Sequence, residues 1–173
     1  MRRRLFTRIV LTVACVVVPC FICPSAAQII TPAAQRAAAP DFTLGDSTAA
    51  PVTLSAYKGK VVLLDVWATW CAGCKVEIPW YIEFEKKYKR RGLASIGVAM
   101  DEDGWKTVSP YLLKKPINYP IVVGNAEFAT AYRVTSLPMT LLIDRNGRIA
   151  DAHVGMVVKS AWEKEIRALL RER

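Results

Sequence analysis

The sequence predicts an α/β fold in which helices flank a central mixed sheet. Two observations carry this prediction: apolar, strand-like runs alternate with amphipathic helical segments, and the last two strand-like runs are separated only by a tight turn. A helical crossover joins parallel strands and a tight turn joins antiparallel ones, so both kinds of pairing are expected in one sheet. The length of 173 residues suits one hydrophobic core and leaves no room for two.

Residues 1–27 have the layout of a secretory signal peptide. A cationic start is followed by an almost purely apolar run at residues 9–23, and Ser25 and Ala27 supply the small residues that precede cleavage before Gln28. The run of 15 residues is shorter than the ~20 that span a bilayer as a helix. Extension through residue 27 gives 19, which leaves an uncleaved anchor and membrane association open. We expect a periplasmic or otherwise extracytoplasmic location.

The rest of the chain divides into a linker and one domain. Residues 28–40 are rich in Ala and contain two Pro, which predicts a linker; the folded domain is expected at residues 41–173. The net charge of +9 falls to +5 without the first 27 residues, because these carry four Arg and no acid. The remaining charges are mixed in sign, with no run of six alike. Phosphate recognition needs a clustered basic face, so no nucleic-acid partner is expected.

The predicted elements follow one another along the domain. Strands are expected at residues 41–44, 52–54, 61–67, 93–100, 119–123, 139–143 and 149–155, and helices at 74–90, 104–115, 127–132 and 159–171. The run Val61–Trp67 is almost continuously apolar, which is typical of a central strand covered on both faces. Pro79 should kink the first helix, because it removes a backbone donor. The Asn-Gly pair at residues 146–147 predicts a type I′ hairpin turn.

The five cysteines fall into two groups. Cys15, Cys20 and Cys23 lie within or at the end of the apolar N-terminal run, and we interpret them as small apolar residues of a targeting segment. Cys71 and Cys74 are the only pair in the predicted domain. They form a C-x-x-C motif at the point where a buried strand ends and a helix begins.

The start of a helix is a favourable place for a reactive cysteine pair. Its unpaired amide groups and the positive end of its dipole favour thiolate over thiol. We expect Cys71, which precedes the helix, to be exposed and Cys74, one turn in, to be shielded. The outer thiolate can attack a foreign disulfide, and the inner thiol can then release it and leave a disulfide between the pair. Asp65 lies in the preceding strand, where a buried carboxylate needs a partner or a task.

Two other classes of thiol protein remain as alternatives. A zinc site needs two further ligands, and the domain offers one His, His153, and no third Cys; neither a metal nor a cofactor is expected. A copper chaperone could use the two thiols with His153. A peroxiredoxin-like peroxidase needs Thr or Ser three residues before its cysteine and Pro seven before it, but Ala68 and Leu64 occupy these positions relative to Cys71.

The motif and its surroundings resemble the active site of thioredoxin-fold proteins. Residues 62–74 are similar to that family's active-site strand and paired cysteines, and Pro79 matches its helix-kinking proline. Residues 135–138, Thr-Ser-Leu-Pro, resemble the loop that carries the family's cis-proline. The resemblance implies a thioredoxin-like fold with an N-terminal strand extension and a helical insertion, here within about residues 103–125, before the cis-proline loop.

A narrower resemblance points to the exported TlpA/ResA-like subgroup, and it rests on residues 40–42, 74–79 and the hairpin at 141–147. It implies an exported thiol–disulfide oxidoreductase that reduces protein disulfides, of the kind that serves cytochrome c or other metalloprotein maturation. The implied partners are a disulfide-containing protein such as apocytochrome c and a membrane dithiol that donates electrons. The dipeptide Ala72-Gly73 lacks the proline that many relatives place before the second cysteine, so the redox potential cannot be inherited.

The resemblance also assigns roles to individual residues. It implies that Asp65 and Glu77 manage protons at the buried sulfur of Cys74 while Cys71 attacks. The residues implied to contact substrate are Trp70, Ala72, Gly73, Leu137 and Pro138.

Overall fold

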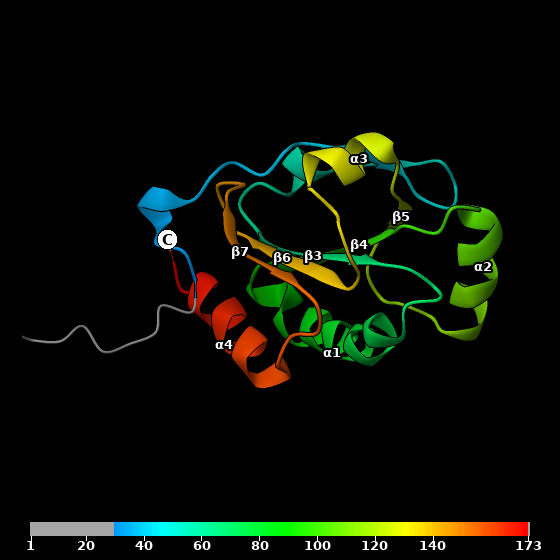
Figure 1. The fold of residues 1–173 in the computed structure, drawn as a ribbon. Coiled ribbons are helices and arrows are strands. Elements are labelled where there is room, and N and C mark those ends of the chain that lie inside the picture. The colour runs from blue at the N-terminus through cyan, green and yellow to red at the C-terminus, as the bar shows by residue number, and fades with distance from the viewer. Residues whose placement is uncertain (1–29, 173) are drawn as a thin grey trace, which may run out of the picture.

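The computed structural model describes residues 30–172, and its centre is one five-stranded sheet (Figure 1). The strands lie in the order β5 (Ile121–Val123), β4 (Leu93–Ala99), β3 (Val61–Trp67), β6 (Met139–Ile143) and β7 (Ile149–Val154). The first three run parallel to one another, whereas β6 is antiparallel to β3 and to β7. This pairing confirms the predicted mixed sheet.

Helices cover both faces of the sheet (Figure 1). On one face lie α1 (Ala72–Tyr88) and α4 (Lys159–Leu169); on the other lies α3 (Ala126–Ala131), with α2 (Trp105–Lys114) beyond the β5 edge. A separate antiparallel pair, β1 (Thr43–Gly45) and β2 (Pro51–Thr53), precedes the sheet. Within residues 30–172 the structure also has three short 3₁₀ helices, at Ala33–Gln35, Leu54–Tyr57 and Lys89–Arg91.

Strand β3 feeds both halves of the core because its side chains alternate between the two faces. Every residue of Val61–Trp67 is buried. Leu63 and Trp67 pack in the cluster that contains the inner sides of α1 and α4, whereas Leu64 packs in the cluster that contains Phe128 of α3. The same alternation puts Asp65 on the α1 face, directly before the cysteine motif.

The turn between β6 and β7 differs from the prediction. A type I′ turn needs positive φ at both central residues, but of Asn146 and Gly147 only Gly147 has one, at 75°. Asp144 explains the difference: its carboxylate accepts the backbone N–H groups of Asn146 at 2.9 Å and Arg148 at 3.0 Å. The side chain thus organises a longer loop, and the register shifts at Ile143. The predicted type I′ turn is therefore wrong.

The described part of the predicted linker, residues 30–40, lies against the domain. Its buried Arg36 forms ion pairs with Asp144 at 3.1 Å and Glu172 at 2.6 Å. The backbone of Thr31 donates to Ala150 at 2.8 Å. These contacts hold this segment, residues 30–40, which we call the lead-in, against the β6–β7 hairpin and the C-terminal end of the described chain.

The predicted signal segment and cleavage site lie outside the described residues. Within residues 30–172 no helix is both long and apolar enough to cross a membrane.

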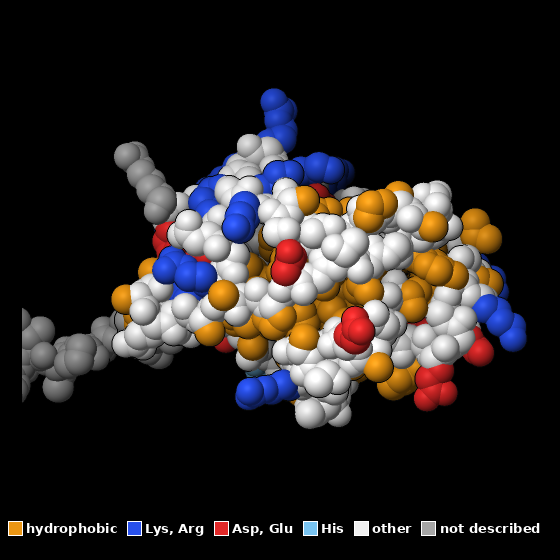
Figure 2. Space-filling view, turned by 90° about the horizontal axis from the view of Figure 1, so that it is seen from above, with side chains coloured by type: hydrophobic (Ala, Val, Ile, Leu, Met, Phe, Trp, Pro, Cys, Tyr) orange, Lys and Arg blue, Asp and Glu red, His pale blue; other side chains and the backbone are white. Residues whose placement is uncertain are grey.

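The face above the sheet shows where charge lies. In Figure 2, hydrophobic side chains remain exposed along the middle of this face, whereas Lys and Arg side chains lie around its margin. Positive charge is thus spread around this face rather than gathered at its centre.

Candidate active site

The cysteine motif occupies the junction between β3 and α1. Cys71 is the N-cap residue of α1, and its sulfur accepts the backbone N–H of Cys74 at 3.2 Å. The two cysteines are joined as a disulfide. Ala72 and Gly73 form the first residues of the helix, so the pair spans the first helical turn, where unpaired amides gather.

The two sulfur-bearing residues are both buried in this oxidised form. Cys74 has an exposed fraction of 0% and Cys71 of 5%. The expectation that Cys71 is exposed is therefore wrong for this state, because Cys71 packs in the buried cluster that contains Trp67 and Cys74. The exposed residue is its neighbour Trp70, at 67%. For the Cys71 sulfur to attack another disulfide, or to be attacked, the side chains packed around it must move.

The loop at Pro138 meets the motif from the other side. The Leu137–Pro138 peptide bond is cis. Pro138 Cδ lies 3.1 Å from the position that a Cβ on Gly73 would occupy, so the loop packs directly on the dipeptide between the cysteines. Pro138 is buried and Leu137 partly buried. The structure therefore brings together two segments that the sequence places more than sixty residues apart.

Asp65 is fully buried on the α1 face of β3. Its Oδ2 accepts a hydrogen bond from the Tyr119 hydroxyl at 3.1 Å, and its Oδ1 has no partner among the described residues. Burial raises the pKa of Asp65 to about 8, the charge of Glu77 adds to the rise, and the Tyr119 hydrogen bond opposes it. A carboxyl group with this pKa can accept or release a proton near neutral pH.

Glu77 is the second buried carboxylate at the site, one turn beyond Cys74. Its Oε1 accepts the backbone N–H of Val157 at 2.6 Å, and its Oε2 has no partner among the described residues. Burial raises the pKa of Glu77, and the Val157 hydrogen bond opposes the rise. The carboxylate thus ties α1 to the loop between β7 and α4.

Tyr81 lies one further turn along α1 and is buried with these carboxyls. Its hydroxyl is 2.9 Å from Thr140 Oγ1 on β6. Burial raises the pKa of Tyr81 strongly, and the charges of Asp65 and Glu77 add to the rise. Tyr81 is therefore a neutral hydroxyl whose electrostatic environment includes both acids. The three groups form a buried polar layer on the α1 side of the sheet.

Asp101 secures the loop that carries Trp70. The backbone N–H of Thr69 lies 3.0 Å from Asp101 Oδ2, and the Thr69 hydroxyl donates to the same carboxylate. Trp70 and Asp101, with Glu102, border an open hollow of about 430 Å³. This hollow lies beside the motif and is accessible to a partner.

Several site residues were not predicted. Tyr81 could have been found, because residues 77 and 81 share a helix face at the i, i+4 spacing. Tyr119 and Asp101 carry no local signal, because they reach the site only through the pairing of β4 with its neighbours.

His153, the candidate metal ligand, is exposed on β7 beside Trp162, at 6.3 Å between ring centroids. Within residues 30–172, no three His, Cys, Asp or Glu side chains cluster as metal ligands would.

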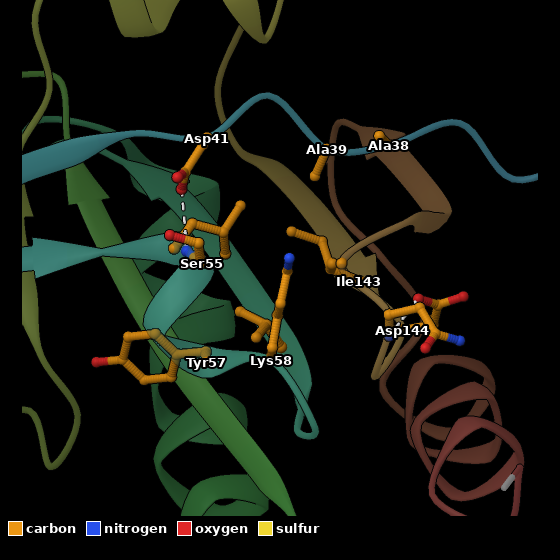
Figure 3. Close-up of a pocket in the computed structure, with 12 residues that line it drawn as sticks. Ala38, Ala39, Asp41, Ser55, Tyr57, Lys58, Ile143 and Asp144 are labelled. Atoms are coloured by element: carbon orange, nitrogen blue, oxygen red, sulfur yellow. Dashed lines mark hydrogen bonds between the residues drawn. The ribbon is translucent and has the colours of Figure 1, made fainter.

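A separate cavity of about 220 Å³ lies at the other end of β3 (Figure 3). It is lined by Ala39 of the lead-in, by Val62 at the start of β3 and by Ile143. Lys58 extends between its two walls, and a hydrogen bond joins Asp41 to Ser55 on one of them. The cysteines follow the opposite end of the strand, so this cavity is not part of the candidate active site.

Comparison with known proteins places the chain in a family. The family described as Redoxin matches residues 34–170. The thiol-disulfide oxidoreductase ResA of Geobacillus kaustophilus is 33% identical over 140 residues, which cover 80% of each chain. The chain belongs to the Redoxin family, among its ResA-like thiol–disulfide oxidoreductases. The thioredoxin-like protein YneN of Bacillus subtilis is 32% identical over 129 residues, 74% of this chain and 76% of that one.

Solved structures agree with this membership of the Redoxin family. A Chlorobium tepidum protein assigned as the thiol:disulfide interchange protein DsbE is 34% identical, with a TM-score of 0.74 over 78% of this chain and 96% of that one. The exposed lipoprotein thioredoxin Etrx1 of Streptococcus pneumoniae is 26% identical, with a TM-score of 0.67 over 75% of this chain and all of that one. The thioredoxin-like fold and the oxidoreductase class predicted from the sequence are confirmed.

Proposed function

We propose that this Redoxin-family chain is an exported reductant of protein disulfides that serves the maturation of cytochrome c or another metalloprotein. The observation that carries the proposal is the Cys71–Cys74 pair at the N-terminus of α1, packed against the cis Pro138. Similarity to ResA and DsbE supports thiol–disulfide exchange as the reaction. The reductive direction and the maturation role are what the TlpA/ResA-like resemblance of residues 40–42, 74–79 and 141–147 implies. The substrate is then a protein such as apocytochrome c whose cysteines must be free before the cofactor is attached.

The reaction transfers two electrons in two exchanges. In the reduced protein, the Cys71 thiolate attacks one sulfur of the substrate disulfide, which forms a mixed disulfide and releases the other substrate sulfur as a thiolate. The Cys74 thiolate then attacks the Cys71 sulfur and releases the second substrate sulfur. The protein ends with the Cys71–Cys74 disulfide that the structure contains, and the substrate ends with two thiols.

Asp65 and Glu77 manage the protons of this cycle. The Cys74 thiol must lose its proton before it attacks, and it does so in a buried site without bulk water to take the proton. Both carboxyl groups are buried and burial raises both pKa values, that of Asp65 to about 8, so Asp65 holds or accepts a proton in the range where a thiol titrates. The charge of Glu77 adds to the rise in the pKa of Asp65, so the ionisation of Glu77 affects when Asp65 releases its proton.

The substrate binds over the motif and the Pro138 loop. Trp70 offers a large exposed aromatic surface on one side, and the partly buried Leu137, which precedes the buried Pro138, borders the other. Ala72 and Gly73 lie between them and carry little side-chain bulk, so the substrate backbone can approach the disulfide.

The proposal places the domain outside the cytoplasmic membrane. Residues 1–27 supply the export signal, and they also supply membrane association if they are retained. Such compartments keep most cysteines oxidised, so a reductant there needs an electron supply. A membrane dithiol that reduces Cys71–Cys74 fills this role.

The equilibrium potential of the cysteine pair tests the direction of the reaction. Titration against glutathione should give a value well below about −120 mV, the level of a strong oxidant, and nearer to the reducing values of about −270 mV. The reduced protein should also reduce a haem-free cytochrome c whose two cysteines are oxidised, at a rate well above that of dithiothreitol at equal thiol concentration. A potential near −120 mV would contradict the reductive role.

Glu77→Gln is expected to shift the apparent titration of the active-site thiols and to slow disulfide exchange by about tenfold or more. The amide removes a titrating group beside Cys74, yet its oxygen can still accept the Val157 N–H, so the fold should be retained. The measurement is the pH–rate profile for reduction of an insulin disulfide.

Glu83→Gln is the matched control for this change. Glu83 lies on the same helix, where it is exposed and pairs with Lys159 away from the cysteines, and its replacement should leave the profile in place. If Glu77→Gln also leaves the profile unchanged, Glu77 is only a favourable acid in the first turns of α1.

A further inference from the structure

One side chain from outside the motif fills the space above the dipeptide between the cysteines. A Cβ placed on Gly73 would lie 3.0 Å from Met156 Cγ and 3.3 Å from Met156 Sδ. These distances are shorter than ordinary van der Waals contact, so the methionine occupies the space that a side chain at position 73 would need. Pro138 borders the same space at 3.1 Å. Gly73, Met156 and Pro138 therefore pack against one another.

The loop that carries Met156 is anchored on both sides of it. The Gly155 N–H donates to the Pro138 carbonyl at 2.8 Å, and the Val157 N–H donates to Glu77 Oε1 at 2.6 Å. Gly155 adopts a φ of 97°, which favours glycine and turns the chain sharply there. The backbone of Met156 is thus held between the cis-proline loop and a buried acid of the site, which directs its side chain onto Gly73.

The Met156 side chain is held in place but not covered. Its exposed fraction is 53%, beside 68% for Val158 in the same loop. Trp70, at 67%, is exposed immediately before Cys71. Large hydrophobic side chains left exposed beside a reactive group mark a contact surface, because an isolated domain gains nothing from leaving them in water.

We propose that Met156 is a specificity-determining residue, which contacts an apolar side chain next to the reacting cysteine of the protein substrate. The inference rests on the proposed function. It adds that the site selects substrate segments with an apolar side chain next to the reacting cysteine. The motif itself contributes only Ala72 and Gly73, so the side chain that shapes the surface over this dipeptide comes from the β7–α4 loop. An unbranched thioether adapts to aliphatic and aromatic partners alike, and a charged partner side chain would be excluded.

The test compares a protein disulfide with a small reagent. Met156→Ala should raise KM for insulin, or for the oxidised haem-free cytochrome c, by about tenfold, as expected for losing the burial of about half a methionine side chain. Reduction of the Cys71–Cys74 disulfide by tris(2-carboxyethyl)phosphine should not slow, because truncation opens the approach to sulfur. Met156→Leu should restore most of the affinity, and Met156→Gln, of similar length but polar, should not.

Leu113→Ala is the matched control. Leu113 is the most exposed of the large hydrophobic side chains among the described residues, at 85%, and it lies on α2 rather than at the site. Its truncation should change neither KM nor the rate with the phosphine. A KM increase in this variant equal to that of Met156→Ala would show a general loss of surface hydrophobicity and overturn the assignment.

A double-mutant cycle tests the contact between Met156 and Gly73. Gly73→Ala should weaken substrate binding because its Cβ displaces Met156, and the loss should be smaller when position 156 is already Ala. Additive effects would overturn the coupling. Unchanged KM in Met156→Ala, with an active wild type, would overturn this inference alone. A wild type that reduces no protein disulfide would overturn the proposed function, and this inference with it.

Discussion

Cys74→Ser is expected to accumulate mixed disulfides with protein substrates, whereas Cys71→Ser is expected to form none and to lose reductase activity to the background level. Cys71 is the N-cap of α1 and borders the exposed Trp70, whereas Cys74 lies one turn deeper with no exposed surface. Only Cys71 can therefore meet a foreign disulfide first. Without Cys74, the attack proceeds but the resolving exchange cannot follow. Insulin reduction and non-reducing gels of the trapped adducts measure the two effects.

The trapped partners would also identify the natural substrate. The Cys71→Ser/Cys74→Ser double variant is the control, and it should form no adducts. If Cys71→Ser traps partners and Cys74→Ser does not, the order of attack argued from the helix geometry is reversed. If neither variant traps a partner and both lose a bound metal that the wild type retains on purification, the protein is a copper chaperone.

Asp65→Asn is expected to stabilise the oxidised protein, by roughly 6 kcal/mol at pH 9. Burial raises the pKa of Asp65 to about 8 from an ordinary value of 3.8, and each pKa unit corresponds to about 1.4 kcal/mol. Ionisation of the Asp65 carboxyl therefore costs free energy in the folded state, whereas in the unfolded state it carries no such cost. The cost is absent below about pH 4, grows as the pH rises to about 8 and is constant above it. The neutral Asn avoids this cost, and its side-chain oxygen can still accept the Tyr119 hydroxyl.

Urea unfolding at pH 5, 7 and 9 measures this gain, with the disulfide kept intact so that the thiols do not titrate. The stabilisation should be smallest at pH 5 and largest at pH 9. Asp103→Asn removes an exposed carboxylate and should show no such trend. A gain that is independent of pH would mean that Asp65 is not protonated in the fold. The same variant should slow thiol exchange, because a buried acid that lowers stability is retained for its chemistry.

The local parts of the site could be predicted because local patterns determine them. The apolar run Val61–Trp67 requires burial on both faces and so a place in the middle of the sheet, and the change to helical spacing after it locates Cys71 and Cys74 at a strand–helix junction. Pro79 lies within α1 as predicted. Helix ends were predicted to within a few residues, because fraying and caps decide them. Here α1 starts at Ala72 rather than at Cys74, because Cys71 caps it.

Predictions that depended on side-chain contacts were less successful. The Asn-Gly pair alone predicts a type I′ turn, but the carboxylate of Asp144 binds the turn amides and changes its type. Arg36 lies in an Ala-rich segment without a hydrophobic pattern. It holds that segment against the domain because it forms ion pairs with Asp144 and Glu172, which are distant in sequence. Cys71 was expected to be exposed because it precedes a helix, but it packs in the buried cluster with Trp67 and Cys74.

The sequence by itself determined the class of fold, the C-x-x-C pair and its position at the start of a helix, since each depends on residues within a few positions of one another. Only the tertiary structure decided what surrounds the pair. The placement of β6 beside β3 and of β7 beside β6 brings Pro138 and Met156 onto Gly73, and the Val157 amide onto Glu77. Such contacts join segments between 65 and 83 residues apart, and they form only when burial of the whole sheet determines the order of its strands.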